Sequence, residues 1–250
     1  MPRVICIIPA RYSSSRFEGK PLADIAGKPM IQHVYERVLR SKSVSHVAVA
    51  SDDERILSTV EKFGGNAIST SDRHRSGTDR IAEAVQSLNL KDSDIVVNIQ
   101  GDQPLFVPSQ IDEVVAPLLD DSLLDFCTLV YRIRREEEIH HPNAVKVVFD
   151  EDHFALYFSR AAIPYVRDKN NEVSYYKHHG IYSYRKDFLV TFTGLPEGYL
   201  EKLEALEQLR ALENGYKIKV VETEHDSVEV DTPEELERVR KILAEEAVDS

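Results

Sequence analysis

Short apolar runs alternate with helical patterns along the first half of the chain. The runs predict buried strands over residues 4–8, 46–50, 67–68 and 94–99. Apolar residues spaced three and four apart predict three helices. The first covers residues 30–39, the second runs from Asp52 or Asp53 to residue 63, and the third runs from Thr78 or Asp79 to residue 88. Strands that alternate with helices are typical of βαβ units and a mostly parallel sheet with right-handed crossovers.

The pattern changes after Pro108. A helical pattern at 111–118 is followed by strand-like runs over residues 126–133, 144–149, 154–159 and 178–184. Little helix is expected between these runs, so this region should be mixed or antiparallel. A leucine-rich stretch predicts a helix from Leu200 to Asn214, with Glu204, Glu207 and Gln208 on its polar face.

The chain returns to a strand over 216–221 and ends in a helix that begins at Thr232. Thr232 as N-cap, Pro233 at the first position and Glu235 form a capping-box pattern. We therefore expect one α/β domain over residues 1–250, a doubly wound, mostly parallel sheet with a smaller β-rich portion.

Composition narrows the class of protein. The 250 residues are 42% hydrophobic and 30% charged, as in ordinary globular domains. No apolar run approaches the roughly 18 residues of a membrane span, and the first run is too short for a secretory signal.

Cys6 and Cys127 lie in strand-like runs, so we expect buried thiols in a reducing cytoplasm. The net charge of −12 argues against broad nucleic-acid binding.

A basic loop follows the first predicted strand. Arg11, Arg16 and Lys20 lie within ten residues of one another, beside serines and Gly19. Cations, hydroxyls and backbone N–H groups at a strand end are what phosphate oxygens need. The loop contains neither GxxxxGK[ST] nor GxGxxG. A nucleotide triphosphate is the favoured ligand, and a solvated basic loop is the alternative.

Two aspartates predict a cation site. Asp102 directly follows the strand at 94–99, and Asp231 precedes the last helix. Mg²⁺ favours one or two carboxylates together with phosphate oxygens and water. A turn aspartate and a helix cap are the plainer alternatives for Asp102 and Asp231, respectively.

The stretch from Arg75 to Arg80 (RSGTDR) predicts a second ligand-binding position. Gly77 and the free N–H groups of a starting helix can contact a base or a phosphate. A simple helix cap explains Ser76 and Thr78 equally well.

These stretches belong to a series of motifs between about residues 3 and 240. The other blocks are Ile8-Pro9-Ala10-Arg11-Tyr12, Gly19-Lys20-Pro21-Leu22, Asn98-Ile99-Gln100-Gly101-Asp102, Asn143-Ala144-Val145-Lys146-Val147, Tyr157-Phe158-Ser159-Arg160, His178-His179-Gly180 and Leu206-Glu207-Gln208-Leu209-Arg210. In this order and spacing, the series resembles the cytidylyltransferases that activate acidic sugars, and among them the 3-deoxy-manno-octulosonate (KDO) cytidylyltransferases. Two positions depart from that pattern. Gln103 stands where the family has glutamate, and His179 where it has leucine.

The resemblance implies roles for particular residues. Arg11 and Lys20 would hold the β and γ phosphates of CTP, which leaves Arg16 a smaller part. The cytidine pocket would be lined by Pro9, Ala10, Ser76 and Gly77, with Arg75 and Arg80 nearby. Asp102 and Asp231 would bind Mg²⁺ and, with Arg11 and Lys20, form the catalytic set. The sugar would be bound by Gln100, Arg160, His178, Tyr182, Glu207 and Gln208. Arg160 also stands in an apolar strand, where an unpaired cation is costly and a sugar carboxylate would satisfy it.

The resemblance also implies a reaction and an assembly. The anomeric hydroxyl of KDO would attack the α-phosphorus of CTP, and the product would serve lipopolysaccharide assembly. Residues 1–120 and 215–250 would bind the nucleotide, while 121–214 would bind the sugar and form a homodimer. Sialic acid and 8-amino-KDO remain alternative substrates. A nucleotide-binding regulatory module without turnover is an alternative of another class, and a dehydrogenase is disfavoured because GxGxxG is absent.

Overall fold

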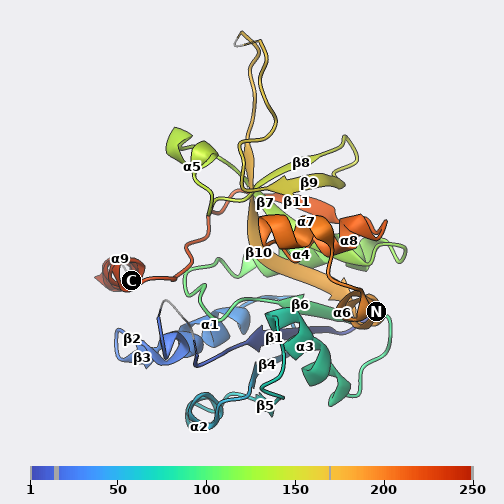
Figure 1. Cartoon of the computed structure of the whole chain (residues 1–250). Coiled ribbons are helices and arrows are strands. Elements are labelled where there is room, and N and C mark those ends of the chain that lie inside the picture. Colours follow the sequence, from blue (N-terminus) through green and yellow to red (C-terminus); the bar gives the residue numbers. More distant parts are fainter. Residues whose placement is uncertain (1, 14–16, 169, 249–250) are drawn as a thin grey trace.

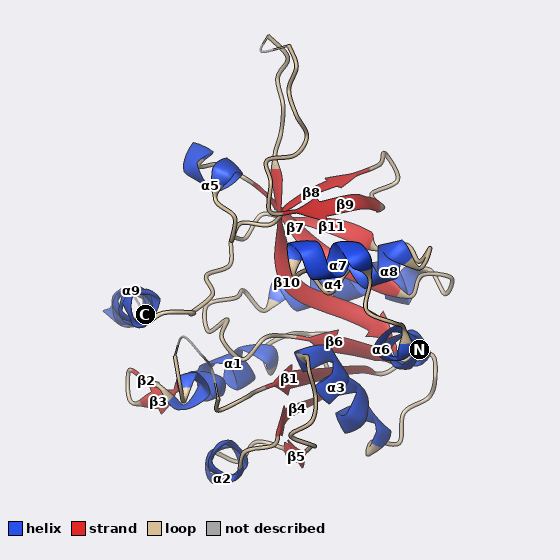
Figure 2. Ribbon diagram, viewed as in Figure 1, coloured by secondary structure: helices blue, strands red, loops and turns tan. Residues whose placement is uncertain are grey.

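A twisted sheet with helices on both faces forms the body of the molecule (Figures 1 and 2). The computed structural model describes residues 2–13, 17–168 and 170–248. Over these residues the sheet has nine strands: β1 (Val4–Pro9), β4 (His46–Ser51), β5 (Ala67–Ser69), β6 (Ile95–Asn98), β7 (Phe126–Arg132), β8 (Lys146–Phe149), β9 (Ala155–Ser159), β10 (Tyr176–Arg185) and β11 (Lys219–Thr223). A separate small ribbon pairs β2 (Asp24–Ile25) with β3 (Lys28–Pro29).

The strand order confirms the doubly wound prediction. The main path runs β11-β7-β10-β6-β1-β4-β5. From β1 the chain moves outward to β4 and β5, and then returns to β6 on the other side of β1; all these neighbours are parallel. Beyond β6 the predicted mixed region begins, because β10 is antiparallel to both β6 and β7. β8 and β9 extend the antiparallel part from the start of β10.

The helices cover both faces of this sheet. In chain order they are the 3₁₀ helix η1 (Lys20–Leu22), α1 (Met30–Val38), α2 (Glu54–Lys62), α3 (Gly77–Gln86), α4 (Ser109–Asp120), α5 (Glu136–His140), α6 (Lys186–Gly194), α7 (Tyr199–Glu204), α8 (Leu209–Glu213) and α9 (Pro233–Val248). The apolar residues of α1, α2 and α4 pack in one core, and those of α3, α6 and α8 in the other. The side chains of β1 contribute to both cores, because the strand is buried on both faces. Cys6 and Ile8 lie in the first core, and Ile5 and Ile7 lie in the second.

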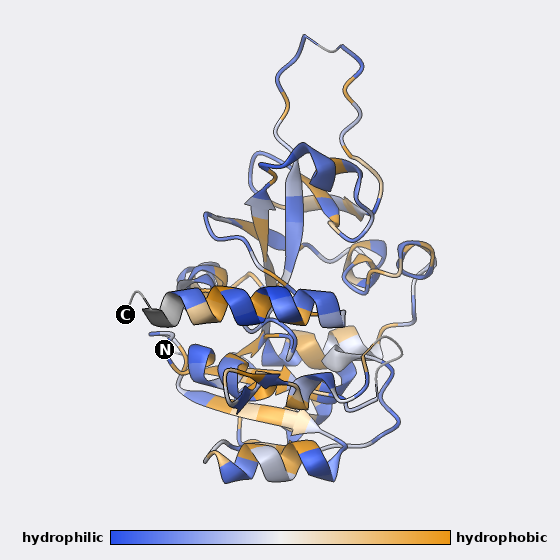
Figure 3. Ribbon diagram, turned by 90° about the vertical axis from the view of Figure 1, so that its left-hand side faces the viewer, coloured by the Kyte–Doolittle hydropathy of each residue, from blue (hydrophilic) through white to orange (hydrophobic). Residues whose placement is uncertain are grey.

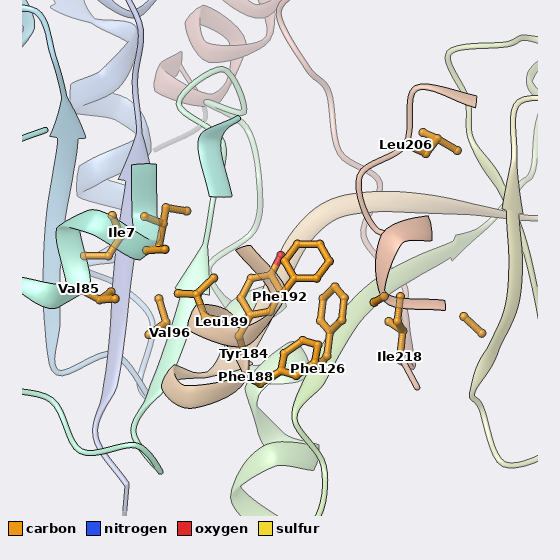
Figure 4. Close-up of a cluster of buried hydrophobic side chains, with 14 of the residues drawn as sticks. Ile7, Val85, Val96, Phe126, Tyr184, Phe188, Leu189, Phe192, Leu206 and Ile218 are labelled. Carbon is orange, nitrogen blue, oxygen red and sulfur yellow. The ribbon is translucent and has the colours of Figure 1, made fainter. Parts of the chain in front are cut away.

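The second core layer is rich in aromatic rings (Figure 4). The rings of Phe126 and Tyr184 stack with centroids 4.6 Å apart, and Phe188 and Phe192 of α6 surround them. Stacked rings bury a large apolar area and fix the packing of α6 on β7 and β10. The free thiols of Cys6 and Cys127 are buried, and desolvation raises the pKa of Cys127 to about 12. The prediction of two buried hydrophobic cysteines is therefore confirmed.

The C-terminal helix packs against the N-terminal part of the chain. Apolar residues of α9, including Leu236 and Val239, pack with Ile25 and Met30 beside the small β2–β3 ribbon. Figure 3 shows α9 as a helix on which apolar and polar residues alternate around its surface. This packing brings the segment just before α9 next to the loop that follows β1.

The predicted helix from Leu200 to Asn214 is wrong as a continuous element. It is two short helices, α7 and α8, because Ala205 takes a left-handed backbone conformation (φ 51°) between them. Leu203, a leucine of this stretch, is 66% exposed. Glu204 does not share a helix face with Glu207 and Gln208, because the break lies between them. The break places these two residues in a turn that faces the sheet.

Other parts of the chain also differ from expectation. The helix α6 forms where none was predicted, whereas the short α5 agrees with the expectation of little helix between the strands. β11 begins three residues later than expected. The family resemblance assigns residues 215–250, which include β11, to the nucleotide-binding part, yet β11 pairs with β7 at the far edge of the sheet. The division into nucleotide-binding and sugar-binding portions stays a prediction, since one continuous sheet joins them.

A long segment between β9 and β10 projects from the body of the molecule (Figures 1 and 3). It carries Tyr165, whose side chain is 88% exposed. None of the helices in the described ranges combines the length and apolar character that crossing a bilayer requires.

Candidate active site at the carboxyl ends of β1 and β6

The site lies where the chain reverses direction in the sheet. β1 and β6 are parallel neighbours, with Ile7 opposite Asn98, so the loops that follow them leave the same edge side by side. This edge is the topological switch point, since the strands beyond β1 and beyond β6 are added in opposite directions. Doubly wound proteins bind their ligands at that position. The loop after β1 carries Arg11 and Lys20, and the loop after β6 carries Asp102.

Lys20 joins the two predicted metal ligands. Its Nζ donates to Asp102 Oδ2 at 2.7 Å and to Asp231 Oδ1 at 3.1 Å. Desolvation alone would lower the pKa of Lys20, but the carboxylates of Asp102 and Asp231 outweigh it and raise that pKa. The three side chains are only partly exposed, at 13%, 26% and 28% for Lys20, Asp102 and Asp231. The structure thus brings together three residues separated by up to 211 positions.

The start of α9 holds Asp231 in place. Thr232 Oγ1 accepts a hydrogen bond from the Glu235 backbone N–H at 3.2 Å, and the Glu235 carboxylate accepts one from the Thr232 N–H at 2.9 Å. The predicted capping box is confirmed. In addition, the Val230 N–H donates to the Asp102 carbonyl at 2.9 Å, which fixes the two aspartate-bearing segments to each other.

The pair of aspartates fits a divalent cation. Both carboxylates already converge on one positive group, the ammonium of Lys20. Among the described residues, no group of three or more histidine, cysteine, aspartate or glutamate side chains could hold a metal ion. A cation at Asp102 and Asp231 would therefore take further ligands from phosphate oxygens and water, which is how Mg²⁺ usually binds in nucleotide sites.

The predicted arginines differ in their positions. The Arg11 guanidinium donates to the His74 carbonyl at 3.0 Å, which ties the loop after β1 to the segment before α3. Arg80 is buried, at 1% exposure, and pairs with Asp52 at 2.7 Å. Its guanidinium also donates to Thr70. The structure therefore places Arg80 in the protein interior rather than on the ligand-facing surface, while Arg75 is exposed at the start of α3. Arg16 lies outside the described residues.

The start of α3 lies against the loop after β1. Ser76 caps α3, and its hydroxyl accepts a hydrogen bond from the Asp79 N–H at 3.1 Å. A Cβ atom at Gly77 would lie 3.1 Å from Pro9 Cγ and 3.6 Å from Gln100 Oε1. A Cβ atom here would be tighter than ordinary van der Waals contact, which shows how closely the first turn of α3 packs on the ends of β1 and β6. Ala10 is buried beside them.

The predicted sugar-binding side chains line the other side of the same edge. Tyr182 lies opposite Asn98 in the β10–β6 pair, and its hydroxyl donates to Gln208 Oε1 at 3.4 Å. Thr78 Oγ1 donates to Glu207 Oε2 at 2.5 Å, and desolvation raises the pKa of Glu207. Gln100 donates to Asn98 at 3.0 Å.

Unpaired buried polar atoms gather at this edge. Within the described part of the chain, buried side-chain atoms without a hydrogen-bond partner include Asn98 Nδ2, Gln103 Oε1, Glu207 Oε1 and Gln208 Nε2. Such atoms are costly unless a ligand or water satisfies them. A cavity of about 480 Å³ adjoins the site and is lined by Arg75 and Ser76 together with Glu207. Residues predicted to bind cytidine and residues predicted to bind sugar therefore share one cavity.

Arg160 is not an unpaired cation, so that part of the sequence argument is wrong. Its Nε donates to the Glu204 carbonyl at 2.6 Å, and Nη1 donates to the Pro142 carbonyl at 3.0 Å. Nη2 donates to the carbonyl of Ala205 at 3.3 Å. Arg160 thus stabilises the left-handed turn that presents Glu207 and Gln208. Its contact with the sugar carboxylate stays a prediction.

His178 lies among protein atoms that keep its ring neutral. Nε2 is 3.0 Å from Thr128 Oγ1. Desolvation, with a smaller contribution from His179, lowers the pKa of His178 to about 3. A neutral imidazole offers one donor and one acceptor, which suits sugar hydroxyls.

We expect the His178 ring to stay neutral from pH 8 down to pH 5, because even pH 5 lies about two pH units above its pKa of about 3. An NMR titration of the ring carbons should show no protonation step in this range, whereas histidines in the denatured chain should titrate near about 6.5. Because the unfolded chain binds this proton below about pH 6.5 and the folded chain does not, His178 should lower folding stability as the pH falls through that value. A step between pH 6 and 7 that disappears in His178→Gln would contradict the prediction.

The sequence argument missed one acidic residue of this site. Gln103 Nε2 donates to Glu229 Oε1 at 3.0 Å, two residues before Asp231. Desolvation and the neighbouring charges of Asp102 and Asp231 raise the pKa of Glu229 to about 7. Glu229 is nevertheless an exposed residue. The replacement of glutamate by glutamine at 103 was the one signal that this part of the site is unusual.

Comparisons with known proteins agree with this geometry. A family model described as Cytidylyltransferase matches residues 5–218. A solved structure of CMP:2-keto-3-deoxy-manno-octonic acid synthetase complexed with CTP superposes with a TM-score of 0.92, at 45% identity over 98% of this chain and 99% of that one. The chain is therefore a member of the cytidylyltransferase family.

The relatives narrow the family further. A 3-deoxy-manno-octulosonate cytidylyltransferase of Syntrophus aciditrophicus (strain SB) is 71% identical over 97% of this chain and 98% of that protein. An 8-amino-3,8-dideoxy-manno-octulosonate cytidylyltransferase of Shewanella sp. (strain ANA-3) is 52% identical over 96% of this chain and 98% of that protein. Within the cytidylyltransferases, the chain belongs with the 3-deoxy-manno-octulosonate cytidylyltransferases.

Proposed function

We propose that this chain activates KDO by nucleotidyl transfer, converting CTP and 3-deoxy-D-manno-octulosonate into CMP-KDO and diphosphate. The observation that carries the proposal is the convergence of Lys20, Asp102 and Asp231 at the switch point, beside a set of polar side chains suited to a polyhydroxylated sugar. The 71% identical relative that bears this name supports the choice of sugar.

The reaction joins the anomeric oxygen of KDO to the α-phosphorus of CTP. The bond from that phosphorus to the bridging oxygen of the β-phosphate breaks, and that oxygen leaves with the diphosphate, while the proton of the anomeric hydroxyl passes to solvent water. Arg11 and Lys20 neutralise the diphosphate that leaves, and no covalent enzyme intermediate is needed. Catalysis then consists of positioning and charge stabilisation, as in other phosphoryl transfers.

Asp102 and Asp231 would hold Mg²⁺, which when bound supplies positive charge at the α-phosphate and lowers the pKa of the anomeric hydroxyl. The first turn of α3, at Ser76 and Gly77, would receive cytidine together with Pro9 and Ala10. The proposed sugar ligands are Gln100, Arg160, His178, Tyr182, Glu207 and Gln208.

A panel of sugar acids tests this proposal. Diphosphate release should be measured with CTP and KDO, 8-amino-KDO or sialic acid, and CMP-KDO should be identified by mass spectrometry. KDO should give the highest kcat/KM. Preference for 8-amino-KDO would correct the substrate, and CTP binding without diphosphate release from any sugar would favour a regulatory module.

The assembly and compartment follow from the same family resemblance. We propose a homodimer formed through the β-rich middle, where exposed Tyr165 on the projecting segment and exposed Leu156 offer apolar contact area. Light scattering should give twice the chain mass of 28.4 kDa. We further propose that the enzyme works in the cytoplasm, with neither nucleic acid nor membrane as partner, and supplies lipopolysaccharide assembly.

Replacing Arg160 by lysine should raise the KM for KDO about tenfold and change the KM for CTP less than twofold. Lysine keeps the charge but loses the planar group that holds the Glu204 and Pro142 carbonyls. The turn with Glu207 and Gln208 would loosen, and a direct contact with the sugar carboxylate would weaken. Steady-state kinetics checks this, with exposed Arg167→Lys as control. A parallel rise of both KM values would contradict a role on the sugar side.

A further inference from the structure

A hydrogen bond joins Gln103 and Glu229, which lie close in sequence to the two predicted metal ligands, Asp102 and Asp231. Gln103 follows Asp102 directly and is completely buried, whereas the Glu229 side chain is exposed. The amide of Gln103 donates to one carboxylate oxygen of Glu229 at 3.0 Å. A buried amide thus orients an accessible carboxylate two residues from Asp231.

Gly180 leaves space in front of this pair. A Cβ atom at Gly180 would lie 3.6 Å from both Gln103 Nε2 and Glu229 Oε1, and 4.0 Å from Gln100 Cγ. Any other residue at 180 would place its side chain against these groups. Because β10 carries His178 and Tyr182 on either side of Gly180, the space borders the proposed sugar ligands.

Two roles are possible for a carboxylate here, namely a metal ligand or a substrate ligand. The first is disfavoured, because no set of three carboxylate, histidine or cysteine side chains in the described ranges is close enough to share one ion. A substrate ligand fits better, since a carboxyl oxygen accepts hydrogen bonds and the sugar acid presents several hydroxyl donors.

We propose that Glu229 binds the sugar acid directly, by accepting a hydrogen bond from one of its hydroxyl groups, and that Gln103 is the positioning residue that orients the Glu229 carboxylate. The proposal rests on the proposed function, because it takes a sugar acid as the second substrate. The proposed contact adds one sugar ligand, Glu229, close in sequence to Asp231, one of the two proposed metal ligands.

Two variants separate direct binding from a structural role. Glu229→Gln keeps the shape of the side chain but removes its charge. The exchange variant Gln103→Glu/Glu229→Gln keeps one carboxylate and one amide in contact, and moves the carboxylate from the accessible position to the buried one. If Glu229 binds sugar, both variants should raise the KM for KDO about tenfold, with the KM for CTP changed less than twofold.

Deoxy analogues of KDO complete the test. The wild-type enzyme should lose about tenfold in kcat/KM for the analogue that lacks the contacted hydroxyl, and Glu229→Gln should lose much less, because the two changes remove the same hydrogen bond. The proposal would be overturned if the exchange variant recovered the wild-type KM for KDO. It would also be overturned if, for every analogue, the free-energy effect of removing the hydroxyl were the same in Glu229→Gln as in the wild-type enzyme. Failure of the wild-type enzyme to convert KDO would instead refute the proposed function.

Discussion

Replacing Asp102 by asparagine should lower kcat for CMP-KDO formation by about a thousandfold, roughly 4 kcal/mol of barrier. Asp102 is one of two carboxylates that converge on a single cationic position. Asparagine keeps the shape of the side chain and an oxygen ligand, but removes the negative charge that would hold Mg²⁺ beside the α-phosphate. The cost should therefore be found in the chemical step more than in binding of either substrate.

Turnover should be measured by diphosphate release at saturating CTP, KDO and Mg²⁺. Asp152→Asn, at an exposed position away from the site, is the matched control and should keep full activity. The double variant with Asp231→Asn should cost far less than the product of the two single effects, because the carboxylates act as a unit. Near wild-type kcat in Asp102→Asn would refute the assignment of this residue to the metal site.

The location of this site could be predicted from the sequence because it follows from topology. A buried strand that ends at Pro9 and another that ends near Asn98 place their following loops at one edge when the sheet is parallel. That reasoning needs only the alternation of strands and helices. The capping box at Thr232 is equally local, and it correctly positions Asp231 at the start of a helix.

Long-range partners could not be predicted in this way. The leucine spacing from 200 to 214 fits a helix, yet Arg160 holds the carbonyls of Glu204 and Ala205 from 44 and 45 residues away. The resulting turn, not helical periodicity, presents Glu207 and Gln208. Tertiary contacts override helix propensity here.

The same limit applies to charges. The position of Arg80 in the stretch at the start of α3 predicts a ligand-binding arginine, but Arg80 is buried and pairs with Asp52 on another loop. Likewise, no sequence pattern marks Glu229, since its contact with Gln103 joins residues 126 positions apart. Sequence spacing identified the segments of the site, and packing decided which side chains reach its surface.

Replacing Lys20 by methionine should lower kcat/KM for CTP by about 10² to 10³ while strengthening divalent-cation binding to the CTP-free enzyme. In the structure the Lys20 ammonium donates to both Asp102 and Asp231. It therefore competes with a metal ion for the same two carboxylates before CTP arrives, and it neutralises the triphosphate once CTP is bound. Methionine preserves the length of the side chain and removes only the charge.

Mn²⁺ titration of the CTP-free protein, followed by electron paramagnetic resonance, should show about tenfold tighter binding in Lys20→Met. Lys28→Met is the matched control, because Lys28 pairs with Glu36 at 2.7 Å on the surface and should affect neither Mn²⁺ nor CTP. Unchanged Mn²⁺ affinity together with lost activity would mean that the lysine serves CTP alone. Unchanged kcat/KM for CTP would show that Lys20 does not bind the phosphates. The metal role and the phosphate role can be separated, because the Mn²⁺ titration contains no nucleotide whereas the kinetic measurement does.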